Sequence, residues 1–225
     1  MKIIIVDDHP VVRQGLRQML HNEEDFQVCG EYDRGEDALL ALTELRPDLA
    51  IVDISLAGMD GIELTKNIKA RFDDLGILIL SMSDEALFAE RALRAGANGY
   101  IMKHEGTENL VAAIRKIAKG GFYVSDSMQS ELLQKLIEGR GQTSGSALQG
   151  LSDRELQIFQ MIGRGCGTHN IAEILHLSVS TVETYRTRIK KKLNLKDASA
   201  LIKRAVQWSL FQQQPQSRGL EEPQT

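Results

Sequence analysis

The sequence predicts a doubly wound α/β fold with a five-stranded parallel sheet, followed by a small all-α domain that contains a helix-turn-helix. Three observations predict this arrangement. Short apolar runs alternate with helical patterns as far as residue 123, only helical patterns follow from Leu151 onward, and the charge of the chain changes sign between these two parts. At 225 residues the chain also exceeds the commonest size of one domain, so two domains are expected.

Five short apolar runs in the first part predict the strands. They are almost continuously apolar, which is typical of parallel strands that are covered on both faces. The segments between them place apolar residues three or four positions apart, as in Leu110, Ala113, Ile114 and Ile117, which is the spacing of a buried helix face. The predicted strands span residues 2–6, 26–31, 48–53, 76–81 and 99–102.

A change of composition after Tyr123 divides the chain. We expect an α/β domain over 1–123, a linker over 124–147, a helical domain over 148–211 and a disordered, polar tail over 212–225. The linker begins with a helical pattern and continues with the Gly- and Ser-rich stretch "GRGQTSGSALQG". The helical pattern places four apolar residues on one face: Leu132, Leu133, Leu136 and Ile137.

The two predicted domains carry opposite charges. Residues 1–125 contain 14 Lys and Arg against 21 Asp and Glu, a charge of −7, whereas residues 151–211 contain 10 against 5, a charge of +5. A basic second domain is what a partner with a phosphate backbone requires, and double-stranded DNA is such a partner.

Other classes of protein are disfavoured by the composition. Cys29 and Cys166 are the only cysteines and neither has a metal-type spacing, so the sequence supports neither a disulfide framework nor a zinc site. The apolar runs are strand-sized, and the opening "MKIIIVDD" turns acidic before the core of a signal peptide could form. We therefore expect a soluble cytoplasmic protein without a membrane partner.

Polar side chains follow the predicted strands at their carboxyl ends. Asp7 and Asp8 follow the first strand, Asp53 ends the third, Ser81 ends the fourth and Lys103 follows the fifth. A single Asp in such a position usually caps the next helix or lies in a solvated turn. Because the carboxyl ends of parallel strands share one edge of the sheet, these five residues are instead expected to form one pocket.

The residue types in this pocket point to phosphoryl chemistry. Three neighbouring carboxylates repel one another and need positive charge, which Lys103 and a hard cation such as Mg²⁺ would supply. An Asp oxygen in such a site can attack phosphorus and form an acyl phosphate, while Ser81 hydrogen-bonds a phosphoryl oxygen.

The second domain contains the pattern of a helix-turn-helix. Ser152 and Glu155 form a capping box at the start of its first helix, a short helix near 168–175 precedes the turn "HLS", and a longer helix runs from about 179 to 193. A last helix is expected from Asp197 to about Trp208.

The longer helix has two distinct sides. At 100° per residue, its apolar side is formed by Val182, Tyr185, Ile189 and Leu193, and a polar, basic side lies opposite. On an isolated helix such a side usually means a solvated surface, but here the helix-turn-helix context favours a surface that binds DNA.

These motifs resemble those of a known family. "IIIVDDHP", "IVDISLAGMDG", "LILSMS" and "GYIMK" resemble the receiver domain of response regulators, with its flavodoxin-like fold, over residues 1 to about 120. "LSDREL" and "STVETYRTRIKKKL" resemble the LuxR-type DNA-binding domain over residues 148–211, and the whole chain is similar to the NarL/FixJ family.

The resemblance implies the roles of the pocket residues. It implies Asp53 as the phosphoacceptor, Asp8 as a direct Mg²⁺ ligand with Asp7 in support, and the backbone carbonyl of Ser55 as another ligand. Ser81 and Tyr100 would form the switch pair. The sequence departs from the family in the loop after the phosphoacceptor, where Leu56, Ala57 and Gly58 replace the usual Met-Pro-Gly.

The polar side of the long helix gives the candidate DNA contacts. We expect the major groove to be faced by Thr184, Thr187, Arg188 and Lys191, with Arg188 the best candidate for a guanine contact. Phosphate contacts are expected from Thr181, Arg186, Lys190 and Lys192.

Glu183 stands where many relatives carry Lys. It could accept a hydrogen bond from a cytosine amino group, but a solvated side chain is the favoured interpretation. Gly167, Thr168, His169 and Asn170 replace the usual Ser-Asn-Lys-Glu, which puts a phosphate contact there in doubt.

The combined interpretation is a two-component transcription factor. A sensor histidine kinase would phosphorylate Asp53, and the phosphorylated chain would dimerise and bind a two-fold operator, where it could meet RNA polymerase. The receiver would catalyse only its own phosphorylation and dephosphorylation.

Two rival interpretations remain open. A phosphohydrolase of the haloacid dehalogenase type also uses an Asp nucleophile with Mg²⁺, but it needs a second Asp at the position of Ser55. A regulator that acts without phosphorylation would use the first domain only for dimerisation or ligand binding.

Overall fold

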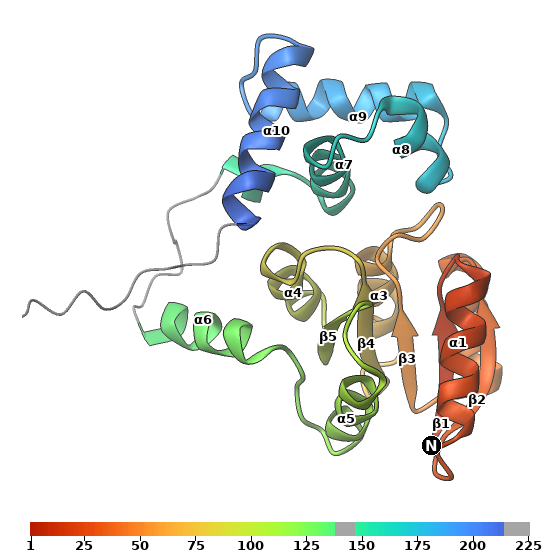
Figure 1. Cartoon of the computed structure of the whole chain (residues 1–225). Helices are drawn as coiled ribbons and strands as arrows, with labels where there is room; N and C mark the ends of the chain where they lie inside the picture. The colour runs from red at the N-terminus through yellow and green to blue at the C-terminus, as the bar shows by residue number, and fades with distance from the viewer. Residues whose placement is uncertain (138–146, 214–225) are drawn as a thin grey trace, which may run out of the picture. The chain divides into compact units, whose positions relative to one another are not determined.

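The structure is a computed structural model, which describes residues 1–137 and 147–213. The described residues fall into two compact units (Figure 1). Residues 1–137 belong to the first unit and residues 147–213 to the second.

A five-stranded parallel sheet forms the centre of the first unit. Its strands lie in the order β2-β1-β3-β4-β5, and the change of direction between β1 and β3 is the arrangement of a doubly wound sheet. This confirms the predicted fold class. The strands are β1 (Lys2–Val6), β2 (Gln27–Tyr32), β3 (Leu49–Val52), β4 (Gly76–Ser81) and β5 (Gly99–Met102).

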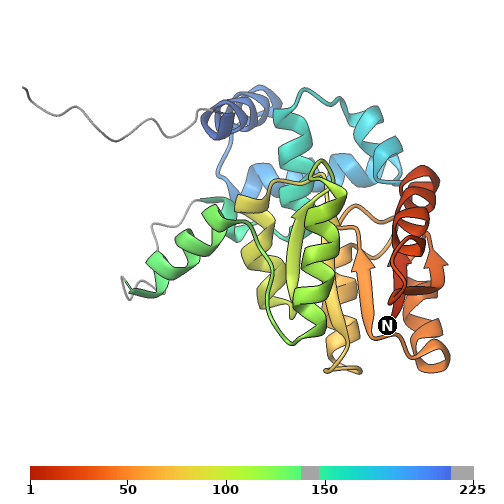
Figure 2. The same ribbon diagram turned by 60° about the horizontal axis from the view of Figure 1, so that its bottom comes forward.

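Helices cover both faces of the sheet (Figures 1 and 2). Alternate strand residues such as Ile3, Ile5 and Ile51 pack under α1 and α5, in a core that includes Leu16 and Ile114. The other strand residues turn toward the opposite face, so the strands are apolar on both sides, as predicted. The helices of this unit are α1 (Pro10–His21), α2 (Gly35–Leu45), α3 (Gly61–Lys69), α4 (Glu85–Arg94), α5 (Thr107–Ala118) and α6 (Asp126–Ile137).

Helix α6 occupies the helical part of the predicted linker and packs beside α4. The chain first passes along β5, where Tyr123 forms an isolated bridge with Gly99. The Ser125 amide then donates to Glu85 Oε1 at 2.8 Å, and Met128 is buried. Two residues of the predicted apolar face, Leu133 and Ile137, do not make this contact, because they are 59% and 83% exposed.

The second unit is helical. Its core includes Ile171, Leu175, Val182, Ile189 and Leu201, and the rings of Phe159 and Trp208 lie 6.1 Å apart. The elements are a 3₁₀ turn, η1 (Ala147–Gly150), and the helices α7 (Asp153–Gly163), α8 (Thr168–Ile174), α9 (Val179–Lys192) and α10 (Ala198–Gln213).

The end of α10 corrects one expectation. The helix continues to Gln213, past its expected end near Trp208, and therefore includes the first two residues of the predicted tail 212–225. "WSLFQQ" contains neither Gly nor Pro, so nothing local stops the helix at Trp208. The rest of the predicted tail, and most of the Gly- and Ser-rich part of the linker, lie outside the described residues.

No helix within residues 1–137 and 147–213 is long and apolar enough to cross a membrane.

Candidate functional site

The strand register brings the predicted pocket residues to one edge of the sheet. Val6 pairs with Val52, and Val52 pairs with Ile79, so the residues that follow β1 and β3 leave the sheet at the same level. The Asp53 amide still donates to the Val6 carbonyl at 2.8 Å, and this bond holds Asp53 beside Asp7.

Lys103 joins the two acids. Its Nζ lies 2.6 Å from Asp7 Oδ2 and 2.9 Å from Asp53 Oδ2. All three side chains are largely buried, with 9% of the Lys103 side chain exposed and 2% of each acid. A cation between two buried carboxylates offsets their repulsion, so the structure brings together residues 50 positions apart in one charged cluster.

Burial shifts the protonation of this cluster. Burial alone would lower the pKa of Lys103, but the carboxylates of Asp53 and Asp7 raise that pKa above its usual range. Burial raises the pKa of Asp53; Lys103 opposes this rise, and Asp7 adds to it. A further cation in the cluster would favour the carboxylate form of Asp53, which is the form that can act as a nucleophile.

Asp8 and His9 complete a possible metal site. Ligand atoms of Asp7, Asp8, His9 and Asp53 all lie within 4.8 Å of one another. In the part of the chain that the structure describes, Asp53 Oδ1 is buried and accepts no hydrogen bond. A set of carboxylate oxygens with such an oxygen suits Mg²⁺, so the residues present fit the expected ion. The expected ligand Ser55 lies two residues after Asp53, but the contact of its carbonyl with an ion stays a prediction.

His9 was missed in the sequence interpretation. Its Nδ1 lies 2.6 Å from Asp8 Oδ1 and 3.4 Å from Asp7 Oδ1. The available signal was an imidazole directly after two acids. Residue order alone does not show that the His9 ring turns back toward Asp7 and Asp8. Pro10 begins α1, and the backbone geometry of the turn before it decides the direction of the His9 side chain.

The loop after Asp53 is held close to it. Asp60 caps α3 by accepting hydrogen bonds from the Ile62 and Glu63 amides, at 3.0 and 2.9 Å. A Cβ on Gly61 would lie 2.1 Å from the Asp53 carbonyl oxygen, so only glycine allows this approach of α3 to the end of β3.

The predicted switch residues lie in one hydrogen-bonded group at the end of β4. The Tyr100 hydroxyl donates to the Ser83 carbonyl at 2.6 Å, and the Ser83 amide donates to Ser81 Oγ at 3.1 Å. Both Ser81 and Tyr100 are fully buried. Burial raises the pKa of Tyr100 far above its usual range, so its hydroxyl stays a donor. The loop that leads into α4 is thus held by both residues.

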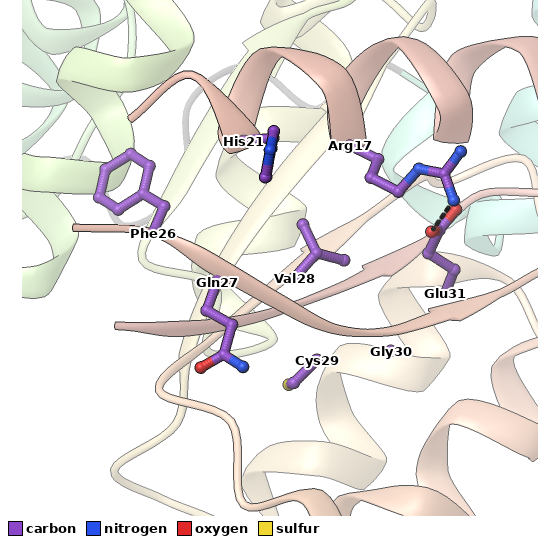
Figure 3. A pocket seen from close by; sticks show the side chains of 8 residues that line it. All are labelled: Arg17, His21, Phe26, Gln27, Val28, Cys29, Gly30 and Glu31. Carbon is purple, nitrogen blue, oxygen red and sulfur yellow. Dashed lines mark ion pairs between the residues drawn. The ribbon is translucent and has the colours of Figure 1, made fainter. Parts of the chain in front are cut away.

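A separate cavity of about 600 Å³ lies between α1 and β2, at the edge of the sheet (Figure 3). Arg17 and Glu31 form an ion pair across it, with Arg17 Nη1 and Glu31 Oε1 3.5 Å apart. It contains none of the residues of the acid cluster.

In the second unit, local sequence builds the helix-turn-helix as predicted. Ser152 Oγ accepts from the Glu155 amide while Glu155 Oε2 accepts from the Ser152 amide, which confirms the capping box of α7. Ser178 caps α9 by accepting from the Thr181 amide at 3.0 Å. The turn between α8 and α9 contains His176 with φ of 50°.

The two sides of α9 are placed as predicted. Val182 and Ile189 are fully buried, and Tyr185 is half-buried. The guanidinium of Arg188 lies 5.8 Å from the centre of the Tyr185 ring, where a cation–π contact can orient it. The residues expected to face the major groove are exposed: Thr184, Thr187, Arg188 and Lys191.

Two of the side chains that are expected to contact phosphate already have partners inside the unit. Arg186 Nη1 donates to Thr168 Oγ1 at 2.9 Å, and only 12% of the Arg186 side chain is exposed. Lys192 Nζ lies 2.6 Å from Glu155 Oε2. Thr181 and Lys190 are half-buried on α9. Contacts of these four residues with phosphate stay predictions.

Glu183 is solvated, as in the favoured interpretation, with 57% of its side chain exposed, but it also has partners inside the unit. Its Oε1 accepts a hydrogen bond from Thr168 Oγ1 at 2.8 Å and lies 3.7 Å from Arg186 Nε. Thr168 is the first residue of α8, so this acid links the two helices of the helix-turn-helix. The pattern of α9 alone did not predict this partner, which lies 15 residues earlier in the chain.

A doubly wound sheet with an acid and lysine cluster at its carboxyl edge, joined to a helix-turn-helix unit, defines the class of response regulators. Residues 3–115 match the family model described as response regulator receiver domain, and residues 149–205 match the one described as bacterial regulatory proteins, luxR family. The chain belongs to the two-component response regulators that join a receiver to a LuxR-type DNA-binding domain and regulate transcription.

Similar proteins span nearly the whole chain. The oxygen regulatory protein NreC of Staphylococcus carnosus is 37% identical over 215 residues, which cover 94% of this chain and 99% of NreC. The response regulator GacA of Pseudomonas aeruginosa is 37% identical over 195 residues, covering 87% of this chain and 90% of GacA.

Solved structures agree with this assignment. RcsB from Salmonella enterica serovar Typhimurium, bound to the promoter rprA in the presence of the phosphomimetic BeF3-, has a TM-score of 0.59 at 26% identity and covers 92% of this chain and 98% of its own. A LuxR-family response regulator from Aurantimonas has a TM-score of 0.57 at 33% identity, covering 60% of this chain and 97% of its own.

Proposed function

We propose that a sensor histidine kinase phosphorylates Asp53, and that phosphorylation controls dimerisation and the binding of the chain to a two-fold DNA site. The observation that carries this proposal is the position of Lys103 Nζ, 2.6 Å from Asp7 and 2.9 Å from Asp53, beside the ligand atoms of Asp8. A buried acid with a cation and a cation-binding cluster next to it is suited to receive a phosphoryl group.

The chemical step is an attack of a carboxylate oxygen of Asp53 on the phosphorus of a phosphohistidine. A P–O bond forms and the P–N bond breaks, with its electron pair returning to the imidazole nitrogen of the kinase, which leaves as the neutral ring when it is protonated. Lys103 would neutralise charge on the transferred group, and the Ser81 hydroxyl would turn from the Ser83 amide to a phosphoryl oxygen.

The acid cluster would hold Mg²⁺ during this step. Asp7, Asp8 and Asp53 supply carboxylate oxygens, the Ser55 carbonyl is the further expected ligand, and the bound ion would neutralise part of the charge of the phosphoryl group.

Ser81 and Tyr100 would transmit the effect of phosphorylation from the acid cluster to the start of α4. Both bind Ser83, directly before Asp84, which caps α4. A move of Ser81 toward the phosphoryl group would release the Ser83 amide and shift the start of α4. The dimer formed in this way would present two copies of α9 to a two-fold operator.

On DNA, the exposed side of α9 would enter the major groove. In this proposal Thr184, Thr187, Arg188 and Lys191 meet base edges, with Arg188 at a guanine. Phosphates are met by Thr181, Arg186, Lys190 and Lys192. A promoter-bound dimer could then contact RNA polymerase. The promoter complex of RcsB supports DNA binding by a similar chain, and DNA as the partner implies that the chain acts in the cytoplasm.

The test compares the full chain with Asp53→Asn and with a control, Asp74→Asn, whose residue is exposed in the turn between α3 and β4. DNA is selected from a random pool at fixed salt, because backbone contacts depend on salt, with and without acetyl phosphate. We expect one added phosphoryl group and tighter binding in the wild type and the control, and neither in Asp53→Asn. Equal phosphate incorporation and DNA affinity in all three proteins would contradict the proposal.

The rival functions predict other outcomes. We propose that the chain turns over no external phosphate ester, because the position of the second Asp in the hydrolase class is Ser55. Steady hydrolysis of a phosphate ester would favour the hydrolase. A regulator that acts without phosphorylation would gain no phosphoryl group in mass spectra after treatment with acetyl phosphate.

A further inference from the structure

We infer that Glu183 is a specificity-determining residue that selects a cytosine in each half-site of the operator, and that Thr168 and Arg186 position it. The inference rests on the proposed function, in which α9 lies in the major groove. The structural basis is the three-residue network Thr168, Glu183 and Arg186, which ties the first turn of α8 to the exposed surface of α9.

Glu183 lies beside the side of α9 that is proposed to face DNA. Thr187 follows it by four residues, so the two side chains lie on the same side of the helix, one turn apart. Glu183 is nearer than Thr187 to the amino end of α9, and the amino-terminal residues of a recognition helix are the ones that contact base edges. Its side chain is 57% exposed.

The carboxylate of Glu183 is held by one oxygen. Thr168 Oγ1 donates to Oε1 at 2.8 Å, and Arg186 Nε lies 3.7 Å from the same oxygen. Thr168 in turn accepts from Arg186 Nη1 at 2.9 Å. The second oxygen, Oε2, takes part in none of these contacts. The network therefore fixes the direction of the carboxylate while one oxygen stays available as an acceptor.

The chemistry of the major groove decides which base suits such an acceptor. Cytosine N4 and adenine N6 are the amino donors on that side of the base pairs. Adenine places its N7 acceptor beside N6, where it would repel a carboxylate, whereas cytosine presents its amino group without a neighbouring acceptor on the same base. A fixed carboxylate without a matching donor would only add repulsion from the phosphates. Cytosine is therefore the base that Glu183 selects.

The test is selection of DNA from a random pool by the full-length chain in the presence of BeF3-, at fixed salt. The wild type is compared with Glu183→Ala and with Glu173→Ala, which removes an exposed acid of α8 and changes the charge equally. We expect a cytosine preference of about fivefold at one position of each half-site in the wild type and the control, and its loss in Glu183→Ala. The remaining positions of the motif should stay unchanged.

A second pair of variants tests the positioning role of Thr168. Thr168→Ser keeps the hydroxyl and should keep the cytosine preference, whereas Thr168→Val removes the donor and should weaken that preference at the same position. Circular dichroism of each variant checks that the helical unit is folded.

The outcomes separate this inference from the proposed function. If Glu183→Ala changes the affinity for all sequences by one factor and leaves every base preference as it was, the acid only repels phosphates and the inference is wrong, while the proposed function stands. If the wild type selects no motif at all, the proposed function fails, and the inference fails with it.

Discussion

Lys192 Nζ at the end of α9 lies 2.6 Å from Oε2 of Glu155 in the first turn of α7. The same carboxylate oxygen accepts the Ser152 amide in the capping box, so one acid both starts α7 and fixes the carboxyl end of α9. The position of α9 within its unit therefore depends on a local capping motif 37 residues earlier in the chain.

Acid is expected to weaken the helical unit through Glu155. Although burial acts to raise the pKa of Glu155, the Lys192 ammonium and the Ser152 amide lower it below its ordinary value of 4.5. A lowered pKa in the folded state stabilises the fold at pH values above the unfolded value, and this contribution is lost as the pH falls below 4.5 through the folded pKa.

Fluorescence of Trp208, the only tryptophan, reports unfolding of this unit alone. We expect Glu155→Gln to reduce the pH dependence of the urea midpoint below pH 4.5, and Glu155→Ala to lower the free energy of unfolding by about 1 kcal/mol at pH 7. Glu173→Ala, on α8, serves as the control. An unchanged acid slope in Glu155→Gln would show that the pair with Lys192 contributes nothing.

Two glycine substitutions in the receiver should have opposite effects. A Cβ at Gly61 would lie 2.1 Å from the backbone oxygen of Asp53, whereas a Cβ at Gly15, inside α1, meets nothing within 4 Å. We expect Gly61→Ala to destabilise the receiver by roughly 1–3 kcal/mol and to slow phosphorylation, because Asp53 must move. Gly15→Ala should stabilise it by about 0.5–1 kcal/mol. Urea unfolding followed by circular dichroism measures both changes in the free energy of unfolding. If Gly61→Ala changed neither this free energy nor the rate of phosphorylation, α3 could shift without displacing Asp53.

Most of the fold could be predicted because its strands are continuous apolar runs, and parallel strands fix which residues meet at the carboxyl edge. The shared carboxyl edge of parallel strands was enough to predict that Asp7, Asp53 and Lys103 lie together. The face on which α6 packs could not be predicted in this way. Periodicity finds an apolar stripe, but it does not show which stripe meets a partner, and Met128 is buried while Ile137 is exposed.

Contacts between helices were also beyond the sequence patterns. Thr168 and Glu183 are 15 positions apart and belong to different helices, and their hydrogen bond depends on the angle between α8 and α9. The side-chain direction of His9 depends likewise on the turn before α1. The structure thus adds a hydrogen-bond partner to the solvated Glu183 and makes His9 a member of the acid cluster.

Removing the charge of Lys103 should slow phosphorylation and move its pH profile upward. Lys103 lowers the pKa of Asp53, so without it the carboxylate is ionised only at higher pH. We expect Lys103→Met to reduce the initial rate of phosphate incorporation from acetyl phosphate by roughly 100-fold at pH 7 with saturating Mg²⁺, as on loss of one charge-stabilising donor. Lys119→Met, at the exposed end of α5, should behave as the wild type. A wild-type rate and pH profile in Lys103→Met would contradict the role given to this ion pair.

Loss of the Tyr100 hydroxyl should separate phosphorylation from its effect on DNA binding. Tyr100→Phe keeps the buried ring but leaves the Ser83 carbonyl without its donor at 2.6 Å, which should cost about 1–2 kcal/mol of receiver stability. Asp53 and Lys103 keep their contacts, so the rate of phosphate incorporation should stay within about twofold of the wild type. A twofold change in rate corresponds to less than about half a kcal/mol of activation free energy. The increase in DNA affinity on phosphorylation should shrink, because the loop before α4 loses one of its two attachments.

Tyr123→Phe, at a half-buried ring on the far side of β5, is the matched control. If Tyr100→Phe and Tyr123→Phe both keep the full increase in DNA affinity, the bond from Tyr100 to Ser83 carries no part of the signal.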